Sequence, residues 1–351
     1  MSTNPRLFWI KHSNRNFNSP DTRGKNQFNS SFPASLVAYL YSKSLDCIYI
    51  KADNNNEIIH STLSANSLFW ISPLDDHTFY SFESIYSPYQ TFYIWNTPRI
   101  DLVIQDTRTW TCLKWLEIKL TALPDNSTCE LEENLYSCEL VIRPDTISYL
   151  ACSIAKNFSW RINELKRLLW DLSWVSWEDE RDVISKYPTF LDIIEKIIKH
   201  EYLNQEPLVL QPIRKTDGKK PTLATNCLDV FVRSNLALIH LFSDFSVRNI
   251  TKIGRTERTL IWLIRMLQDF SLNEQIDAST IIDQLSYNTK NDKAFSVNWR
   301  VTHKFLNCDE LIHPRILKSE IKNIILWWWQ NLLSPERRFD AIIFNTPDLF
   351  N

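Results

Sequence analysis

The chain has 351 residues, of which 44% are hydrophobic and 23% charged, and its formal net charge is −2. These values are typical of a folded globular protein and exclude a disordered one. The net charge is not positive, as it is in many nucleic-acid-binding proteins, although a local cluster of basic residues is enough to bind phosphates. Only 3 glycines are present, which argues against a Rossmann fingerprint or a P-loop, because both need several glycines close together.

The cysteines and the apolar stretches bear on the compartment. The 7 cysteines are scattered without a CxxC pair, which argues against a zinc ribbon or a disulfide framework and favours a reducing environment. Charged residues precede any long apolar run, so no signal peptide is expected. The most apolar stretch, 321–333, is too short to span a membrane. We therefore expect a cytoplasmic protein without a membrane partner.

The first 158 residues predict a mixture of helices and strands. Ser30 or Ser31 can cap a helix that has Pro33 in its first turn. Further along, two strand-like runs flank a polar turn, which predicts a hairpin. The elements expected after the first helix are a strand at 47–51, a helix at 72–86, hairpin strands at 100–105 and 113–120, a strand at 139–143, and a helix from Asp145 or Thr146 through 155.

From residue 159 onward the pattern is mostly helical. Trp170, Trp174 and Trp177 recur at i, i+4 and i+7, which predicts one helix face packed into the core. Further helices are expected at 192–200, 236–245, 258–270 and 320–333. The last contains Trp327, Trp328 and Trp329. Three consecutive residues cannot share one helix face, so we expect this helix to be covered on several sides, either by the rest of the chain or by a second subunit.

These patterns predict an α/β fold with a mixed sheet flanked by helices. Residues 1–158 should form the core of this fold, with the predicted hairpin at about 98–121. The largely helical region 159–351 should pack on this core as part of one compact protein.

The residues that carry chemistry lie on the predicted hairpin. Side chains alternate across a strand, so Glu117 and Lys119 share one face while their apolar neighbours point into the core. Asp101 begins the preceding strand and can lie beside Glu117. Two carboxylates held together are costly unless a cation neutralises them, and Mg²⁺ suits such a site. Lys119 can orient or deprotonate a water and offset charge on a phosphate. The set indicates a PD-(D/E)xK nuclease.

A second stretch of the sequence also matches the PD-(D/E)xK pattern, but it is predicted to be helical rather than a hairpin. Pro144 and Asp145 are followed by Glu164 and Lys166. Asp145 is placed to cap a helix, and Glu164 and Lys166 fall in a predicted helix, where residues two apart do not share a face. We interpret them as a cap and as solvated charges.

Other polar residues have two interpretations each. Glu83 precedes the hairpin and is either an additional acidic residue aimed at the metal or a solvated helix charge. Basic residues near the three glycines form either ordinary solvated loops or loops that bring cations and amides to phosphates and bases. The candidates for DNA contacts are Lys25, Asn26, Gln27, Asn29, Lys219, Lys220 and Arg255.

The sequence resembles type II restriction endonucleases of the HindVP kind. The resemblance rests on residues 24–36, 98–104, 116–125, 138–140 and 143–146, and is more specific than the short nuclease pattern alone. Asp101, Glu117 and Lys119 match the catalytic positions of the family one by one. The sequence departs from the general pattern because Pro98 stands three residues before Asp101 rather than next to it, which matters little since proline is not a ligand.

The resemblance implies an enzyme of a restriction–modification system that works beside a cognate DNA methyltransferase. It implies Mg²⁺-dependent double-strand cleavage of unmethylated DNA at a short palindrome, expected to be GRCGYC. A palindrome cut by a chain with one site implies a homodimer. Two alternatives remain: a repair or structure-specific nuclease with the same core, and a DNA-binding protein whose nuclease site is vestigial.

Overall fold

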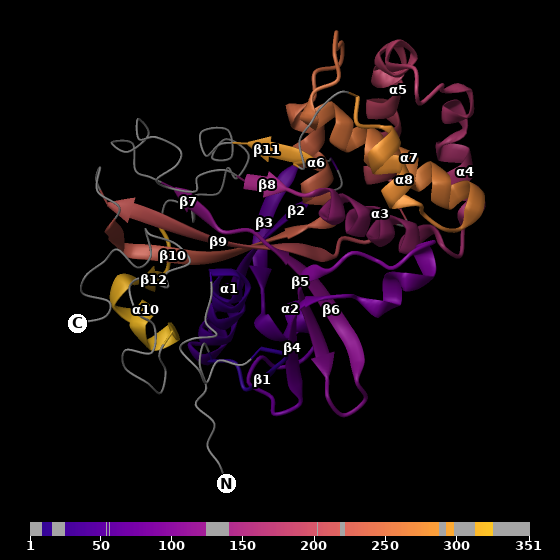
Figure 1. Cartoon of the computed structure of the whole chain (residues 1–351). Helices are drawn as coiled ribbons and strands as arrows, with labels where there is room; N and C mark the ends of the chain where they lie inside the picture. The colour runs from indigo at the N-terminus through magenta and orange to yellow at the C-terminus, as the bar shows by residue number, and fades with distance from the viewer. Residues whose placement is uncertain are drawn as a thin grey trace.

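Strands from both halves of the chain build one central sheet (Figure 1). The structure is a computed structural model that describes residues 9–15, 25–53, 55, 57–123, 140–201, 203–217, 222–287, 293–297 and 313–325. Within these ranges the main sheet has ten strands. It contains both parallel and antiparallel pairs, as the predicted α/β fold with a mixed sheet requires.

Eight strands run across the sheet, and two short strands pair beside them. The order is β1 (His12–Ser13), β4 (Thr78–Ser84), β5 (Ile100–Asp106), β6 (Thr111–Ile118), β9 (Pro207–Asp217), β10 (Thr222–Ser234), β2 (Cys47–Ala52) and β3 (Ile58–Leu63). Beside this path, β7 (Thr121–Leu123) pairs with β9 and β12 (Ile316–Leu317) pairs with β10. A separate two-stranded sheet joins β8 (Leu140–Ile142) to β11 (Phe295–Val297).

Helices cover both faces of the sheet (Figure 1). Because side chains alternate along a strand, Trp115 and Val209 point to one face and Leu116 and Leu210 to the other. The first face packs against α3 (Pro144–Phe158), α5 (Glu180–Ile198), α6 (Asn235–Phe245) and α7 (Arg255–Asn273). The second packs against α1 (Lys25–Ser42), α2 (Ala65–Phe69) and α10 (Lys318–Ile325). Burial on both faces makes the sheet the rigid centre of the protein.

Several predicted elements are confirmed. The predicted hairpin is formed by β5 and β6. The strand expected at 139–143 is β8, and the helix expected after it is α3. The helices expected at 236–245 and 258–270 lie within α6 and α7, and the helix expected at 192–200 overlaps α5, which ends at Ile198. For the helix expected at 320–333, the structure describes α10; Trp327, Trp328 and Trp329 lie outside the described residues. In the described part of the chain, no helix is long and apolar enough to cross a membrane.

Other predictions are wrong. Residues 78–84 form strand β4 rather than helix, because their aromatic side chains fit a pleated strand between β1 and β5. The short 3₁₀ helix η3 (Ser87–Phe92) follows. Helix α1 starts at Lys25, so Pro33 lies inside it rather than in its first turn. The described part of the second half is mostly helical, as expected, but it also contributes β9 and β10 to the middle of the sheet, and these two strands were not predicted.

The tryptophan pattern does not form one buried helix face. Helix α4 (Ile162–Leu168) ends before Trp170, and a 3₁₀ helix, η5 (Trp170–Trp174), replaces the regular turn. Trp170 and Trp174 are 64% and 77% exposed. Only Trp177 packs inward, stacked on Phe190. The change of helical period after α4 separates side chains that an α-helix would align.

Candidate active site

Asp101 and Glu117 face each other across the β5–β6 hairpin. The antiparallel ladder pairs Leu102 with Leu116, so the next pair places Asp101 opposite Glu117. Their side chains point to the face covered by α3, because Leu102 and Leu116 point to the opposite core. The backbone N–H of Ile118 donates a hydrogen bond to Oδ2 of Asp101 at 2.8 Å. The two carboxylates are therefore held on adjacent strands, as the sequence predicted.

Lys119 completes the predicted set directly after β6. Its backbone N–H donates to the carbonyl of Leu210 on β9 at 2.9 Å, which fixes the end of the hairpin against the centre of the sheet. Its Nζ lies 2.5 Å from Oε1 of Glu117. The side chains of Glu117 and Lys119 are only 9% and 14% exposed. Burying the two charges of this ion pair costs desolvation free energy, which favours a functional role for the pair over a stabilising one.

The charges of the site are strongly coupled. Burial, followed by the charge of Glu117, raises the pKa of Asp101 to about 7. Burial lowers the pKa of Lys119, but the carboxylates of Glu117 and Asp101 outweigh burial, and its net pKa is raised. Without a bound metal, Lys119 therefore stays protonated at neutral pH.

The donor set fits a divalent cation. Mg²⁺ needs only one or two carboxylates, because it keeps waters and takes phosphate oxygens as further ligands. Asp101 and Glu117 supply two carboxylates whose mutual repulsion a cation would relieve. Across the described ranges, no group of three or more His, Cys, Asp or Glu side chains is arranged to hold a metal ion. The site fits a metal shared with substrate, not a closed protein cage.

Glu83 lies on strand β4, next to the site but turned toward another partner. It sits between Phe82 and Ser84, whose β5 partners flank Asp101. Its backbone is left-handed, with φ 49°, and its carboxylate forms an ion pair with Arg15 at 3.0 Å. Arg15 is also within electrostatic range of Asp101. Glu83 is thus on a strand rather than the expected helix, and Arg15 is a charge beside the site that sequence patterns did not reveal.

The residues of the second written pattern separate in space. Glu164 and Lys166 are on α4, where Glu164 pairs with Arg167 one turn along the same helix. Asp145, in the first turn of α3, lies within electrostatic range of Glu117 and Lys119. The helix charges expected of Glu164 and Lys166 are confirmed, but Asp145 is not the expected cap, because the capping position of α3 is Arg143. The start of α3 belongs instead to the neighbourhood of the site. Thr146 of this turn, which the sequence indicated only as a possible helix start, donates a hydrogen bond to Glu117.

The candidate DNA-contacting residues are only partly described. Lys25, Asn26, Gln27 and Asn29 lie in the first turns of α1 rather than in a loop, and the structure does not describe their side chains. Lys219 and Lys220 lie outside the described residues. Arg255 is the exposed first residue of α7, directly after the capping residue Gly254.

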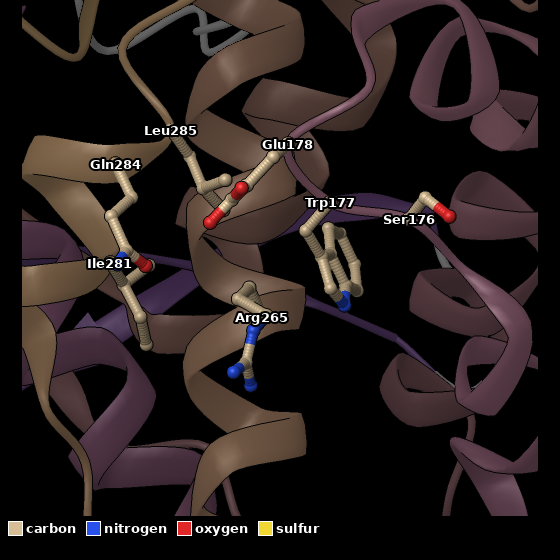
Figure 2. A pocket seen from close by; sticks show the side chains of 7 residues that line it. All are labelled: Ser176, Trp177, Glu178, Arg265, Ile281, Gln284 and Leu285. Carbon is tan, nitrogen blue, oxygen red and sulfur yellow. The ribbon is translucent and has the colours of Figure 1, made fainter.

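A cavity of about 330 Å³ lies away from the hairpin, among the helices of the second half (Figure 2). Its aromatic wall is already engaged: Trp177 stacks on Phe190, lies 5.9 Å from the guanidinium of Arg265, and donates from Nε1 to Gln268 at 2.9 Å. These contacts indicate a packing role. The lining residues are Ser176, Trp177, Glu178, Arg265, Ile281, Gln284 and Leu285.

Comparisons with known proteins agree on one family. The model of the HindVP restriction endonuclease family matches residues 23–350. The chain is 44% identical over 349 residues to the type II restriction enzyme HgiDI of Herpetosiphon aurantiacus, covering 99% of this chain and 97% of that protein. It is 40% identical over 352 residues to the probable type II restriction enzyme HindVP of Haemophilus influenzae, covering 100% and 96%. No solved structure matches. The chain belongs to the HindVP restriction endonuclease family.

Proposed function

We propose that this protein is a type II restriction endonuclease that cuts both strands of unmethylated DNA with Mg²⁺, using Asp101, Glu117 and Lys119 as its catalytic centre. The observation that carries the proposal is the pair of opposed carboxylates with a lysine bonded to one of them, on one hairpin of a chain that belongs to a restriction endonuclease family. This is the arrangement expected of a PD-(D/E)xK nuclease.

Each residue has a distinct role in the proposed hydrolysis. Asp101 and Glu117 would hold Mg²⁺, which lowers the pKa of a bound water and polarises the phosphate when it is present. Lys119 would orient or deprotonate the attacking water and offset negative charge that develops on the phosphate. Without metal, the carboxylates of Glu117 and Asp101 raise its pKa.

The partners follow from the proposed substrate. A palindrome presents the same bases on both strands about a two-fold axis, so two copies of this chain related by that axis would place one centre on each strand. We propose a homodimer on DNA, a cognate methyltransferase that protects the host site without a stable complex, and a cytoplasmic location. The resemblance to the HindVP family supports GRCGYC as the recognition site.

Sequencing the ends of cut DNA tests the proposal against its alternatives. The protein is incubated with plasmid and Mg²⁺, and the fragment ends are sequenced. We expect both strands to be cut at one short palindrome. Ends scattered over unrelated sequences would favour a repair or structure-specific nuclease. Tight binding to one sequence without any cutting would favour a vestigial site.

A further inference from the structure

Helix α3 begins against the strand that carries the candidate metal ligand. Thr146, in the first turn of this helix, is 1% exposed. Its hydroxyl donates to Oε1 of Glu117 at 2.9 Å. The ammonium of Lys119 bonds the same oxygen at 2.5 Å. Two donors that meet on one oxygen fix the rotation of the carboxylate, while Oε2 accepts neither of these two bonds.

The hydroxyl is held in place by the way α3 is anchored. One turn along the helix, the Tyr149 hydroxyl donates to the carbonyl of Pro98 at 2.8 Å and accepts from the backbone N–H of Tyr86 at 3.1 Å. The Tyr149 ring packs against Trp115, with ring centroids 4.8 Å apart. Pro98 leads into β5 and Trp115 lies on β6, so α3 braces both strands of the hairpin. Thr146 therefore meets Glu117 from a fixed support.

The hydroxyl of a helical threonine has a local alternative, the carbonyl three or four residues before it. Its hydroxyl can bond within its own helix, as the buried Thr259 does when it donates to the carbonyl of Arg255 at 2.8 Å. Thr146 instead donates to a carboxylate on another element. Hydrogen bonds to charged groups are stronger than neutral ones, so the contact can set the direction of the Glu117 side chain.

We propose that Thr146 is a positioning residue for Glu117, which orients the carboxylate so that Oε2 is presented for metal binding. The inference rests on the proposed function, because it gives Glu117 a role as ligand. Without the Thr146 hydroxyl, Oε1 keeps only the hydrogen bond from Lys119 of these two, and the carboxylate can rotate toward the ammonium. A carboxylate that must turn back to bind Mg²⁺ should bind it more weakly.

Three variants separate the hydroxyl from its surroundings. Thr146→Val keeps the shape and removes the donor, Thr146→Ser keeps the donor, and Thr259→Val removes a buried hydroxyl away from the hairpin. Two quantities are measured for each full-length protein: the Mg²⁺ concentration that gives half-maximal plasmid cleavage, and the rise in melting temperature on adding Mg²⁺ without DNA. The second readout does not depend on activity. Melting without metal checks that each variant folds, and Thr146→Ala replaces the valine variant if that fails to fold.

We expect Thr146→Val to raise the half-saturating Mg²⁺ concentration about tenfold or more and to reduce the Mg²⁺-induced rise in melting temperature. Thr146→Ser and Thr259→Val should match the wild type in both. A valine variant with wild-type Mg²⁺ dependence would overturn the inference alone, as would a serine variant as impaired as valine. A wild-type protein with no response to Mg²⁺ in either readout would remove the proposed function and this inference with it.

Discussion

The backbone N–H of Ile118 donates a hydrogen bond to Oδ2 of Asp101 at 2.8 Å. Ile118 is the last residue of β6 and stands between Glu117 and Lys119, so the segment that carries two members of the candidate centre also orients the third. The relative positions of all three residues are thus set by one hairpin and its ladder. Rigid sheet elements hold a site more accurately than loops do.

Asp101→Asn should separate charge from shape. The amide oxygen can still accept from Ile118, so the fold should persist, while the loss of an anionic ligand should cost several kcal/mol of transition-state stabilisation. We expect the rate of plasmid cleavage to fall by about a thousandfold or more. Single-turnover cleavage, with circular dichroism as the check on folding, measures both. A folded variant that cuts at the wild-type rate would contradict a ligand role for Asp101.

The raised pKa of Asp101 predicts how stability depends on pH. Its pKa is about 7 in the folded protein and about 4 in an unfolded chain. The folded state therefore binds more protons between these values, and its stability contribution, complete below pH about 4, is lost as the pH rises through about 7.

We expect the free energy of unfolding of metal-free wild type, compared with Asp101→Asn, to fall across this range by at most about 1.4 kcal/mol per pH unit. Urea unfolding in EDTA at several pH values measures the difference, and added Mg²⁺ should flatten it. Parallel profiles for the two proteins would mean that the carboxylate pair is not coupled as described.

An ion pair between the buried Asp229 and the partly exposed Arg315 holds the C-terminal described segment on the sheet. Arg315 donates to both oxygens of Asp229 on β10 at 2.8 Å, and Asp229 is fully buried. Arg315→Ala would leave that carboxylate buried without its cation, which costs about 3–5 kcal/mol in comparable cases. Urea unfolding should show this loss. The matched control is Arg248→Ala, whose ion pair with Asp192 is exposed on both sides and should cost less than about 1 kcal/mol. Equal losses in the free energy of unfolding would show that the Arg315–Asp229 pair contributes no more to stability than an exposed pair.

The proposed homodimer makes a stoichiometric prediction. Two copies of the chain should bind one duplex that carries the palindrome, because each strand needs its own centre. Light scattering with and without the duplex measures the mass of the complex. A complex of one protein with one duplex that still cuts both strands in a single binding event would rule the dimer out.

Sequence patterns predicted the local part of the site and missed the part built from distant segments. The hairpin is close in sequence, and its alternation places Glu117 and Lys119 on one face. Arg15 and Thr146 reach the site only through the pairing of β1 with β4 and the docking of α3. A lone arginine or threonine in a sequence carries no sign of such a contact.

The central strand β9 was missed for a related reason. A strand covered on both faces shows no apolar–polar alternation, and the buried polar residues Gln211 and Arg214 interrupt its apolar run. Its parallel pairing with β6 joins residues far apart in the chain. Trp170 and Trp174 led to the opposite error, the prediction of an element that is absent from the described structure. Their spacing is typical of a buried helix face, but both are exposed and lie after the end of α4.

Plasmid cleavage by five purified proteins decides whether the Asp101 hairpin is the catalytic centre. The wild type is compared with Glu117→Ala and Lys119→Ala on the hairpin and with Glu164→Ala and Lys166→Ala on α4, which carry the same residue types in the second written pattern. We expect both hairpin variants to lose cleavage by about a thousandfold or more, while both α4 variants cut at nearly the wild-type rate. Full cutting by folded Glu117→Ala, or loss of cutting confined to the α4 variants, would contradict the assignment.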